Sequence, residues 1–326
     1  MKKRINLAID AGADGVVCDN NFGSNLAELY QDIYRYASTR KSNVLLMGNS
    51  HTNTYVLNRL VNILATEDGI EPGVWEGGSS QLPQPGLLPV GNGFLVNDIG
   101  PCRIHAALSE GWKPILIENE YLERGDRYTS YMSASSFPLA LAEGMMFGIA
   151  NQVFTAGTFG HDLYRDSPEA KSVWQALGRY NRFFADNEEY YVGARSTASL
   201  AVILDDRSEG VELLNGLASR NVLYDVIYEK DATSEKLNPY AAVALLTAEM
   251  VRVGAVEALE DYLRGGGTVI AAGKVATQDE RGSPRRQPSF LRARAGKGEC
   301  LYFDELPAIN ELARTLMAAD LRPLLW

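Results

Sequence analysis

The sequence predicts an α/β protein of two domains, each built on a parallel sheet. Short, nearly continuous apolar runs alternate with segments of helical spacing, and this alternation restarts after residue 192. Apolar runs of this kind are typical of strands that helices cover on both faces. The length of 326 residues allows two cores of roughly 100–200 residues each. We therefore expect one domain over residues 1–192 and a second over residues 193–326.

The first domain is expected to hold five helix–strand units. Helices are predicted at 5–11, 25–39, 54–65, 103–110 and 136–147, and the strands that follow them at 14–18, 44–48, 72–75, 114–117 and 151–155. A long helix over 168–190 closes the domain. This pattern fits a barrel and an open sheet equally well. The segment 77–101, rich in Gly and Pro, exceeds the ~2–6 residues of an ordinary connection, so we expect a substrate-covering loop.

The second domain is expected to be a flavodoxin-like, three-layer α/β/α sandwich. Strands are predicted at 200–204, 224–228, 242–246, 268–272 and 296–303, with helices at 209–219, 253–264 and 307–319. The charged, arginine-rich segment 276–295 is predicted to be a loop. Apolar strands that alternate with helices are typical of a parallel sheet covered on both faces.

The composition excludes several classes of protein. The net charge of −10 and the pI near 5.0 disfavour nucleic acid and anionic lipid as partners. The three cysteines and three histidines are far apart, so neither a disulfide framework nor a metal site is expected. No apolar stretch approaches the ~20 residues of a membrane span. No cleavage site follows the basic N-terminus, so a cytoplasmic location is expected.

Motifs in both halves resemble known families. The segment Gly12–Asn20 (GADGVVCDN), the strand ends at Asn49 and Glu76, and the helix Ala140–Gly148 resemble, in this order, strands four to eight of glycoside hydrolase barrels. In the second half, Asp225–Glu229 and Val256–Gly273 resemble the class I glutamine amidotransferase-like domain that follows the barrel in some β-galactosidases.

The resemblance implies a TIM-type barrel that is only partial, because five units are present where a complete barrel has eight. Either the barrel is truncated at its N-terminal side or another chain completes it. The resemblance also implies a carbohydrate substrate and a homo-oligomer. No cofactor is expected, because no dinucleotide or phosphate-loop motif is present and Gly265–Gly267 precedes a strand, not a helix.

Polar residues follow the predicted strands of the first domain, and in parallel α/β folds the carboxyl ends of the strands carry the chemistry. Glycosidic hydrolysis needs two carboxyl groups about 5–9.5 Å apart. The resemblance implies Asp19 as the nucleophile and Glu76 as the acid/base, with Glu118 and Glu120 as alternatives. The residues expected to contact substrate are Asn20, Asn49, His51, Asn119 and Trp75, the last as an apolar wall that raises the pKa of Glu76.

Structural roles compete with these assignments. Asp19 also suits a helix N-cap or an Asx-turn, and Glu76 also suits a solvated carboxylate before a loop. The alternative function is that of a catalytically inactive carbohydrate-binding or assembly protein. Glutaminase activity in the second domain is excluded, because Cys300 is its only cysteine and it contains no histidine to activate the thiol.

Overall fold

A computed structural model describes most of the chain. The described residues are 1–18, 26–49, 55–66, 73–76, 88–90, 93–97, 99–119, 134, 136–153, 157–206, 210–288, 291 and 297–318. The chain divides into two compact units. The first comprises Met1–Glu76 with Val90–Ala194, and the second comprises Arg195–Trp326 with Gly77–Pro89.

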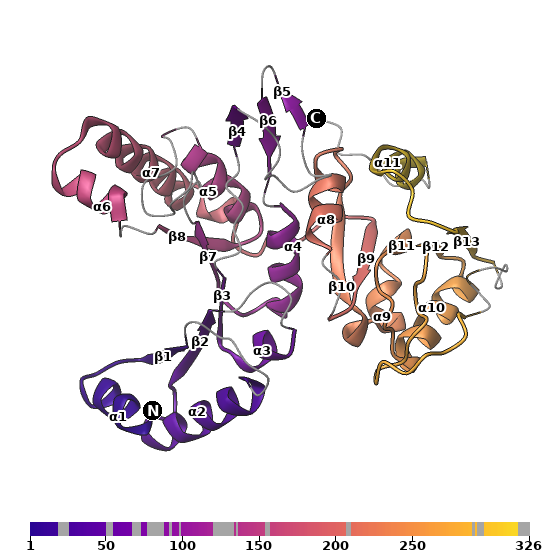
Figure 1. Cartoon of the computed structure of the whole chain (residues 1–326), viewed down its shortest axis with the longest axis horizontal. Helices are drawn as coiled ribbons and strands as arrows, with labels where there is room; N and C mark the ends of the chain where they lie inside the picture. Colours follow the sequence, from indigo (N-terminus) through magenta and orange to yellow (C-terminus); the bar gives the residue numbers. More distant parts are fainter. Residues whose placement is uncertain are drawn as a thin grey trace. The chain divides into compact units, whose positions relative to one another are not determined.

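The first unit is built on a parallel sheet of five strands in the order β1-β2-β3-β7-β8, which is also their order along the chain (Figure 1). The strands are β1 (Gly15–Cys18), β2 (Leu45–Asn49), β3 (Ile63–Thr66), β7 (Ile115–Asn119) and β8 (Ile149–Val153). The helices are α1 (Lys2–Asp10), α2 (Leu26–Arg40), α3 (Tyr55–Leu60), α4 (Ile99–Leu108), α5 (Ser136–Met146), α6 (Gly157–Tyr164) and α7 (Pro168–Asp186), followed by the 3-10 turn η1 (Glu188–Tyr190).

The membership of this sheet differs from the sequence-based expectation. The predicted helix 54–65 ends at Leu60, and Ile63–Thr66 forms the strand β3. The cause is Asn62, whose backbone N donates to Leu46 O and whose Oδ1 accepts from Leu46 N, both at 2.8 Å. These two bonds join the chain to β2 and end the helical turn. A short apolar run does not by itself distinguish a strand from a helix.

The predicted barrel strand 72–75 was wrong. Residues Gly73–Glu76 form β4, which pairs antiparallel with β6 (Gly93–Val96) in a separate three-stranded sheet that also contains β5 (Leu88–Val90). This small sheet lies between β3 and α4 along the chain (Figure 1). The segment 77–101 is therefore more than a loop, because it contains two strands and the first turn of α4.

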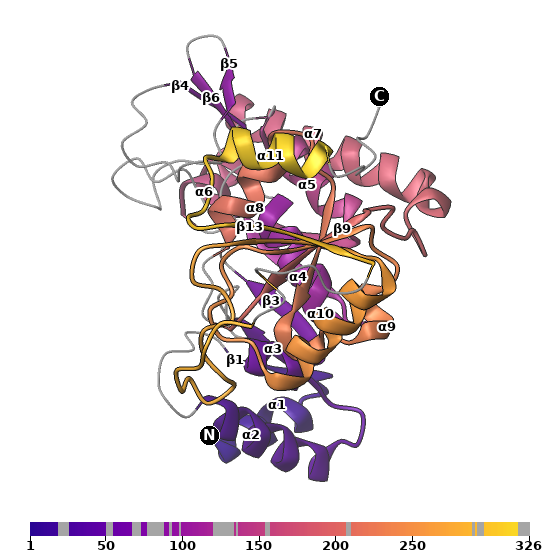
Figure 2. The ribbon, with the colours of Figure 1, turned by 90° about the vertical axis from the view of Figure 1, so that its right-hand side faces the viewer.

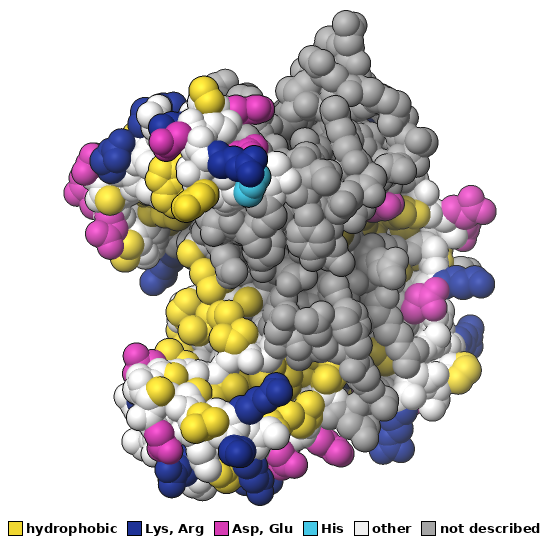
Figure 3. All heavy atoms as spheres, turned by 60° about the vertical axis from the view of Figure 1, so that its left-hand side comes forward, with side chains coloured by type: hydrophobic (Ala, Val, Ile, Leu, Met, Phe, Trp, Pro, Cys, Tyr) yellow, Lys and Arg dark blue, Asp and Glu magenta, His cyan; other side chains and the backbone are white. Residues whose placement is uncertain are grey.

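The two faces of the five-stranded sheet differ in burial. On one face Leu46, Leu64 and Ile149 are at most 1% exposed, and α2 covers this face so closely that a Cβ on Gly48 would lie 2.7 Å from the Tyr30 ring. On the alternate positions, Val17 is 59% and Leu45 is 41% exposed. Hydrophobic side chains are visible on the first unit in Figure 3. Helices thus cover one face more completely than the other.

The second unit contains a five-stranded parallel sheet in the order β10-β9-β11-β12-β13 (Figure 1), of which β9 and β13 are labelled in Figure 2. The strands are β9 (Leu200–Leu204), β10 (Tyr224–Tyr228), β11 (Ala242–Leu245), β12 (Thr268–Ala272) and β13 (Glu299–Phe303). The helices are α8 (Val211–Ala218), α9 (Ser234–Leu237), α10 (Val253–Gly265) and α11 (Ile309–Ala318), with the 3-10 turn η2 (Glu229–Asp231). In the core of this unit, side chains of α9 and α10 pack against alternate strand residues such as Ile203 and Leu245.

Two glycines explain the end of α10. Gly266 has φ +108°, the left-handed conformation that terminates a helix and that a side chain would strain. Gly298 lies so close to the same turn that a Cβ there would be 2.3 Å from Leu263 O. The glycine-rich turn is therefore needed to bring β13 beside β12.

Candidate functional site

The carboxyl edge of the first sheet is the candidate active site, because parallel strands all end at the same edge. Asn49 ends β2 and is paired in register with Ala65 of β3. Glu118 and Asn119 end β7 and are paired with Gln152 and Val153 of β8. Three of the positions singled out in the sequence therefore lie at this edge, on strands that hydrogen bonding joins through β3.

The remaining predicted residues are only partly described. Asp19 and Asn20 follow Cys18, the last residue of β1, but lie outside the described residues together with His51 and Glu120. For Asn49, Trp75, Glu76, Glu118 and Asn119 the structure describes the backbone and not the side chain.

Glu76 does not follow a strand of the parallel sheet. It ends β4 and pairs antiparallel with Gly93, while Trp75 pairs with Phe94. The strand that takes its expected place in the parallel sheet is β3, which ends at Thr66. The expected pairing of Glu76 with Asp19 on one barrel rim therefore loses its structural basis, although the role of Glu76 is not tested by this placement.

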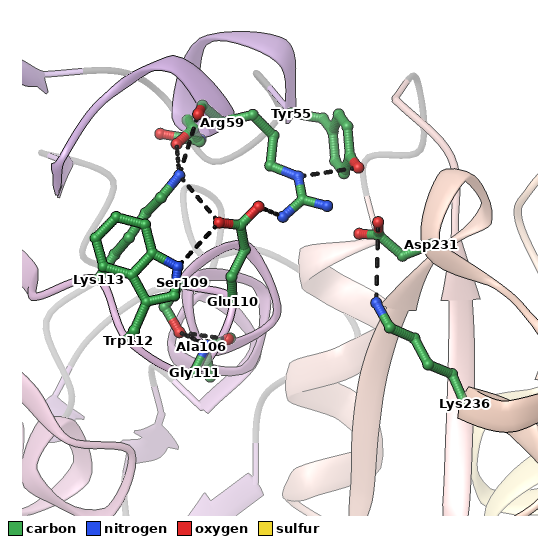
Figure 4. Close-up of polar contacts among 11 residues, drawn as sticks. Tyr55, Arg59, Ala106, Ser109, Glu110, Gly111, Trp112, Lys113, Asp231 and Lys236 are labelled. Carbon is green, nitrogen blue, oxygen red and sulfur yellow. Dashed lines mark hydrogen bonds and ion pairs between the residues drawn. The ribbon is translucent and has the colours of Figure 1, made fainter.

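An ionic network that the sequence did not reveal surrounds the buried side chain of Lys113 at the opposite, amino end of β7 (Figure 4). The Lys113 side chain is 2% exposed, and its Nζ donates to Asn58 O and Arg59 O, both at 3.1 Å. Its ammonium also lies 3.6 Å from Glu110 Oε2. Glu110 in turn forms an ion pair with Arg59 and accepts a hydrogen bond from Trp112 Nε1 at 3.2 Å.

This network fixes structure instead of supporting chemistry. Asn58 and Arg59 lie in the last turn of α3, where carbonyl groups lack intrahelical partners, and the Lys113 ammonium satisfies two of them. Burial lowers the pKa of Lys113, and the Arg59 charge lowers it further. The only sequence signal was a charged pair, Glu110 and Lys113, immediately before an apolar strand.

A second group of charged residues lies at the carboxyl edge of the sheet in the second unit. Glu229, which follows β10, is 1% exposed. Its Oε2 accepts from Arg252 N at 2.9 Å and Nε at 3.3 Å. Burial raises the pKa of Glu229, and the bond from the Arg252 backbone opposes this shift. Asp205 Oδ2 accepts from Met250 N at 2.9 Å, and Lys230 forms an ion pair with Asp206.

Metal and thiol chemistry find little support in the described part of the chain. There, no group of three or more His, Cys, Asp or Glu side chains is arranged to hold a metal ion. Cys18, Cys102 and Cys300 are free thiols, and burial raises the pKa of Cys300 to about 11. A thiol with this pKa is a poor nucleophile near neutral pH. Within the same residues, no helix is long and apolar enough to cross a membrane.

Several solved structures with a similar fold are glycosidases. A β-galactosidase from the haloarchaeon Halorubrum lacusprofundi matches with TM-score 0.64 and 15% identity over 91% of this chain and 58% of its own. A GH42 exo-carrageenase from Bacteroides ovatus matches with TM-score 0.61 and 14% identity over 90% and 43%. An α-L-fucosidase isoenzyme from Paenibacillus thiaminolyticus matches with TM-score 0.57 and 12% identity over 86% and 45%.

These matches establish the likeness of fold. The chain spans about half of the length of these solved structures, or somewhat more in the archaeal case. By sequence, no family model and no curated protein matches the chain.

Proposed function

We propose that the chain is glycoside hydrolase-like and acts on O-glycosidic bonds of an oligosaccharide or glycoside. The observation that carries this proposal is the fold shared with three glycosidases over most of the chain. In this proposal residues 1–192 form part of a TIM-type barrel, and residues 193–326 form a flavodoxin-like domain. The strand order β10-β9-β11-β12-β13 supports the second assignment, because it is the 2-1-3-4-5 order of flavodoxin-like sheets.

The carboxylate pair that we propose is Asp19 with Glu118. Asp19 comes next in sequence after Cys18, the last residue of β1, and Glu118 is the penultimate residue of β7. The strands β1 and β7 belong to one parallel sheet. Three strand spacings of ~4.8 Å separate these strands along the sheet. Rolling of the sheet into a barrel rim shortens this separation towards the ~5–9.5 Å that hydrolysis requires. Glu120 and Glu76 are the alternative partners, and Glu76 ranks last because β4 lies outside this sheet.

In the same proposal, polar residues beside the pair bind substrate hydroxyl groups. The proposed contacts are Asn20, Asn49, His51 and Asn119, while Trp75 would contribute an apolar surface from the small antiparallel sheet. Amide and imidazole groups suit this task because they can donate and accept hydrogen bonds. The protein is further proposed to be a homo-oligomer.

The test is hydrolysis of a panel of nitrophenyl galactosides and fucosides by the purified chain. Asp19→Asn and Glu118→Gln should each reduce kcat/KM at least ~100-fold, the scale of a lost acid–base or nucleophilic group. The control is Asp14→Asn, at the amino end of β1, whose carboxylate is 85% exposed and pairs with Lys41. This variant should retain wild-type turnover. Full activity in Glu118→Gln would reject the pair.

A second candidate function is assembly or carbohydrate binding without catalysis. The observation that favours it is the exposure of the apolar side chains Val17 and Leu45 on the less covered face of the sheet. Clustered exposed apolar groups mark sites where another polypeptide binds. A folded wild-type chain without turnover on any glycoside, together with retention on an immobilised oligosaccharide, would favour this candidate.

A further inference from the structure

The second unit holds four buried side-chain atoms without a hydrogen-bonding partner among the described residues. They are Asp206 Oδ1, Glu229 Oε1, Thr247 Oγ1 and Arg285 Nη2. Buried polar atoms are normally satisfied, so each exception requires an explanation. A single unpaired atom could reflect local packing, whereas four in one region suggest a common cause.

All four residues lie beyond the carboxyl ends of adjacent strands, Glu229 as the first residue of η2. Asp206 follows β9, Glu229 follows β10 and Thr247 follows β11. Arg285 belongs to the loop after β12, where its Nε donates to Ala276 O at 3.0 Å. Because the strand order is β10-β9-β11-β12, these segments are neighbours at one edge of the sheet.

This edge includes the point where the strand order reverses. From β9 the chain places β10 on one side and β11 on the other, so the loops after β9 and β11 diverge from each other. Open α/β sheets bind their ligands in the crevice that this divergence creates. Topology and unpaired polar atoms therefore point independently to the same place.

The charged groups at this edge influence one another, which indicates that they are close. The Asp206 carboxylate raises the pKa of Glu229, and Lys230 and Arg252 lower it. Burial lowers the pKa of Arg285, and the charges of Asp279, Glu280 and Glu229 oppose this shift. Carboxylates and cations are therefore interspersed at this edge, with Asp206 and Glu229 beside Lys230 and Arg252, and Asp279 and Glu280 near Arg285. A charged ligand would thus gain little net electrostatic attraction here.

The hydrogen-bonding requirements define the ligand further. The unpaired oxygens of Asp206 and Glu229 need donors, and Arg285 Nη2 needs an acceptor. The Thr247 hydroxyl can take either role. A hydroxyl group both donates and accepts, so a molecule with several hydroxyls can satisfy all four atoms.

We propose that the carboxyl edge of the second sheet, at the four described residues Asp206, Glu229, Thr247 and Arg285, binds a small uncharged polyhydroxylated ligand. Glu229 and Asp206 accept hydrogen bonds from its hydroxyls, Arg285 donates to them, and Thr247 contributes at the centre of the edge. This site is separate from the carboxylate pair proposed in the first unit. It therefore stands whether or not the chain hydrolyses glycosides.

The test is calorimetric titration of the full chain with D-galactose, glycerol and inorganic phosphate. We expect saturable binding of galactose or glycerol and none of phosphate. Glu229→Gln should weaken binding at least ~10-fold and Thr247→Val about threefold or more, the scale of one charged and one neutral hydrogen bond. Thr247→Val preserves side-chain shape and keeps the test decisive if Glu229→Gln fails to fold.

The control is Glu249→Gln, because Glu249 is exposed in the same loop as Thr247. It should bind as tightly as the wild type. Sugar bound in the first unit would be insensitive to Glu229→Gln and Thr247→Val, which separates the two sites. The proposal is overturned if neither galactose nor glycerol saturates the wild type, if both variants bind normally, or if phosphate is preferred.

Discussion

Replacement of Lys113 by methionine tests whether the buried network in the first unit stabilises the fold. Methionine retains most of the apolar stem, so the change removes the ammonium and leaves the packing largely intact. In the wild type the Lys113 side chain is 2% exposed, and its ammonium donates at 3.1 Å to each of two α3 carbonyls. The variant leaves these carbonyl groups without that donor.

The magnitude follows from two opposing effects. Hydrogen bonds from a charged donor contribute about 1.5–3 kcal/mol each, but burial of an ammonium costs several kcal/mol, which the variant recovers. Unsatisfied carbonyls cost about 1–3 kcal/mol. We therefore expect Lys113→Met to lower the free energy of unfolding by about 1–3 kcal/mol, with Glu110 still paired to Arg59.

Urea denaturation measured by circular dichroism is the assay, with Lys171→Met as the matched control. Lys171 pairs with Asp166 at the surface and is 49% exposed, so its loss should cost less than about 1 kcal/mol. Equal stability of Lys113→Met and wild type would refute the reasoning, because it would mean that the two carbonyl contacts contribute nothing net.

The pH dependence gives a second readout of the same site. The pKa of Lys113 in the folded chain lies below its ordinary value of 10.5. At a pH between the lowered pKa of the folded chain and 10.5, Lys113 is protonated more in the unfolded chain than in the folded chain. The free energy of unfolding therefore rises with pH in this range. Lys113→Met should lack this rise. If the free energy of unfolding of Lys113→Met rises with pH as steeply as that of the wild type, Lys113 is not the source of the rise.

Three further predictions concern other residues. Gly48→Ala should destabilise the first unit by about 1–3 kcal/mol, because its Cβ would lie 2.7 Å from the Tyr30 ring. Gly178→Ala in α7, where the nearest atom would be 3.5 Å away, should stabilise the unit by about 0.5–1 kcal/mol. Thermal unfolding compares the two variants, and equal effects would contradict the close contact at Gly48. The raised pKa of Glu229 means that the folded chain holds its proton above pH 4.5, so stability should fall as pH rises from there, and a fall that persists in Glu229→Gln would exclude this group. Gly298→Ala should prevent close approach to Leu263 O and unfold the second unit at lower urea; unchanged hydrogen exchange in β13 would count against that.

Much of the fold could be predicted from the sequence where burial is local and continuous. The strands 200–204, 224–228 and 268–272 have the predicted bounds, because nearly unbroken apolar runs bounded by polar residues leave few alternatives. The strand β3 could not be predicted in this way. Its residues continue the apolar pattern of α3, and only the two bonds between Asn62 and Leu46 separate them.

The candidate sites show the same limit. Asn49 and Glu118 could be located from sequence because each ends an apolar strand, and the carboxyl edge of a parallel sheet follows from strand order alone. The position of Glu76 could not be foreseen, since β4 resembles a buried strand and differs only in its antiparallel partner β6. The Lys113 network and the Glu229 cluster depend on contacts between residues distant in sequence, which no local pattern records.

The most direct test of the central claim compares Glu118→Gln with Glu76→Gln in hydrolysis of the best nitrophenyl glycoside, at equal concentrations of folded protein. We expect Glu118→Gln to lose at least ~100-fold in kcat/KM, while Glu76→Gln retains turnover near that of the wild type. The reverse result, with activity lost in Glu76→Gln and retained in Glu118→Gln, would contradict the assignment of the active site to the carboxyl edge of the five-stranded sheet.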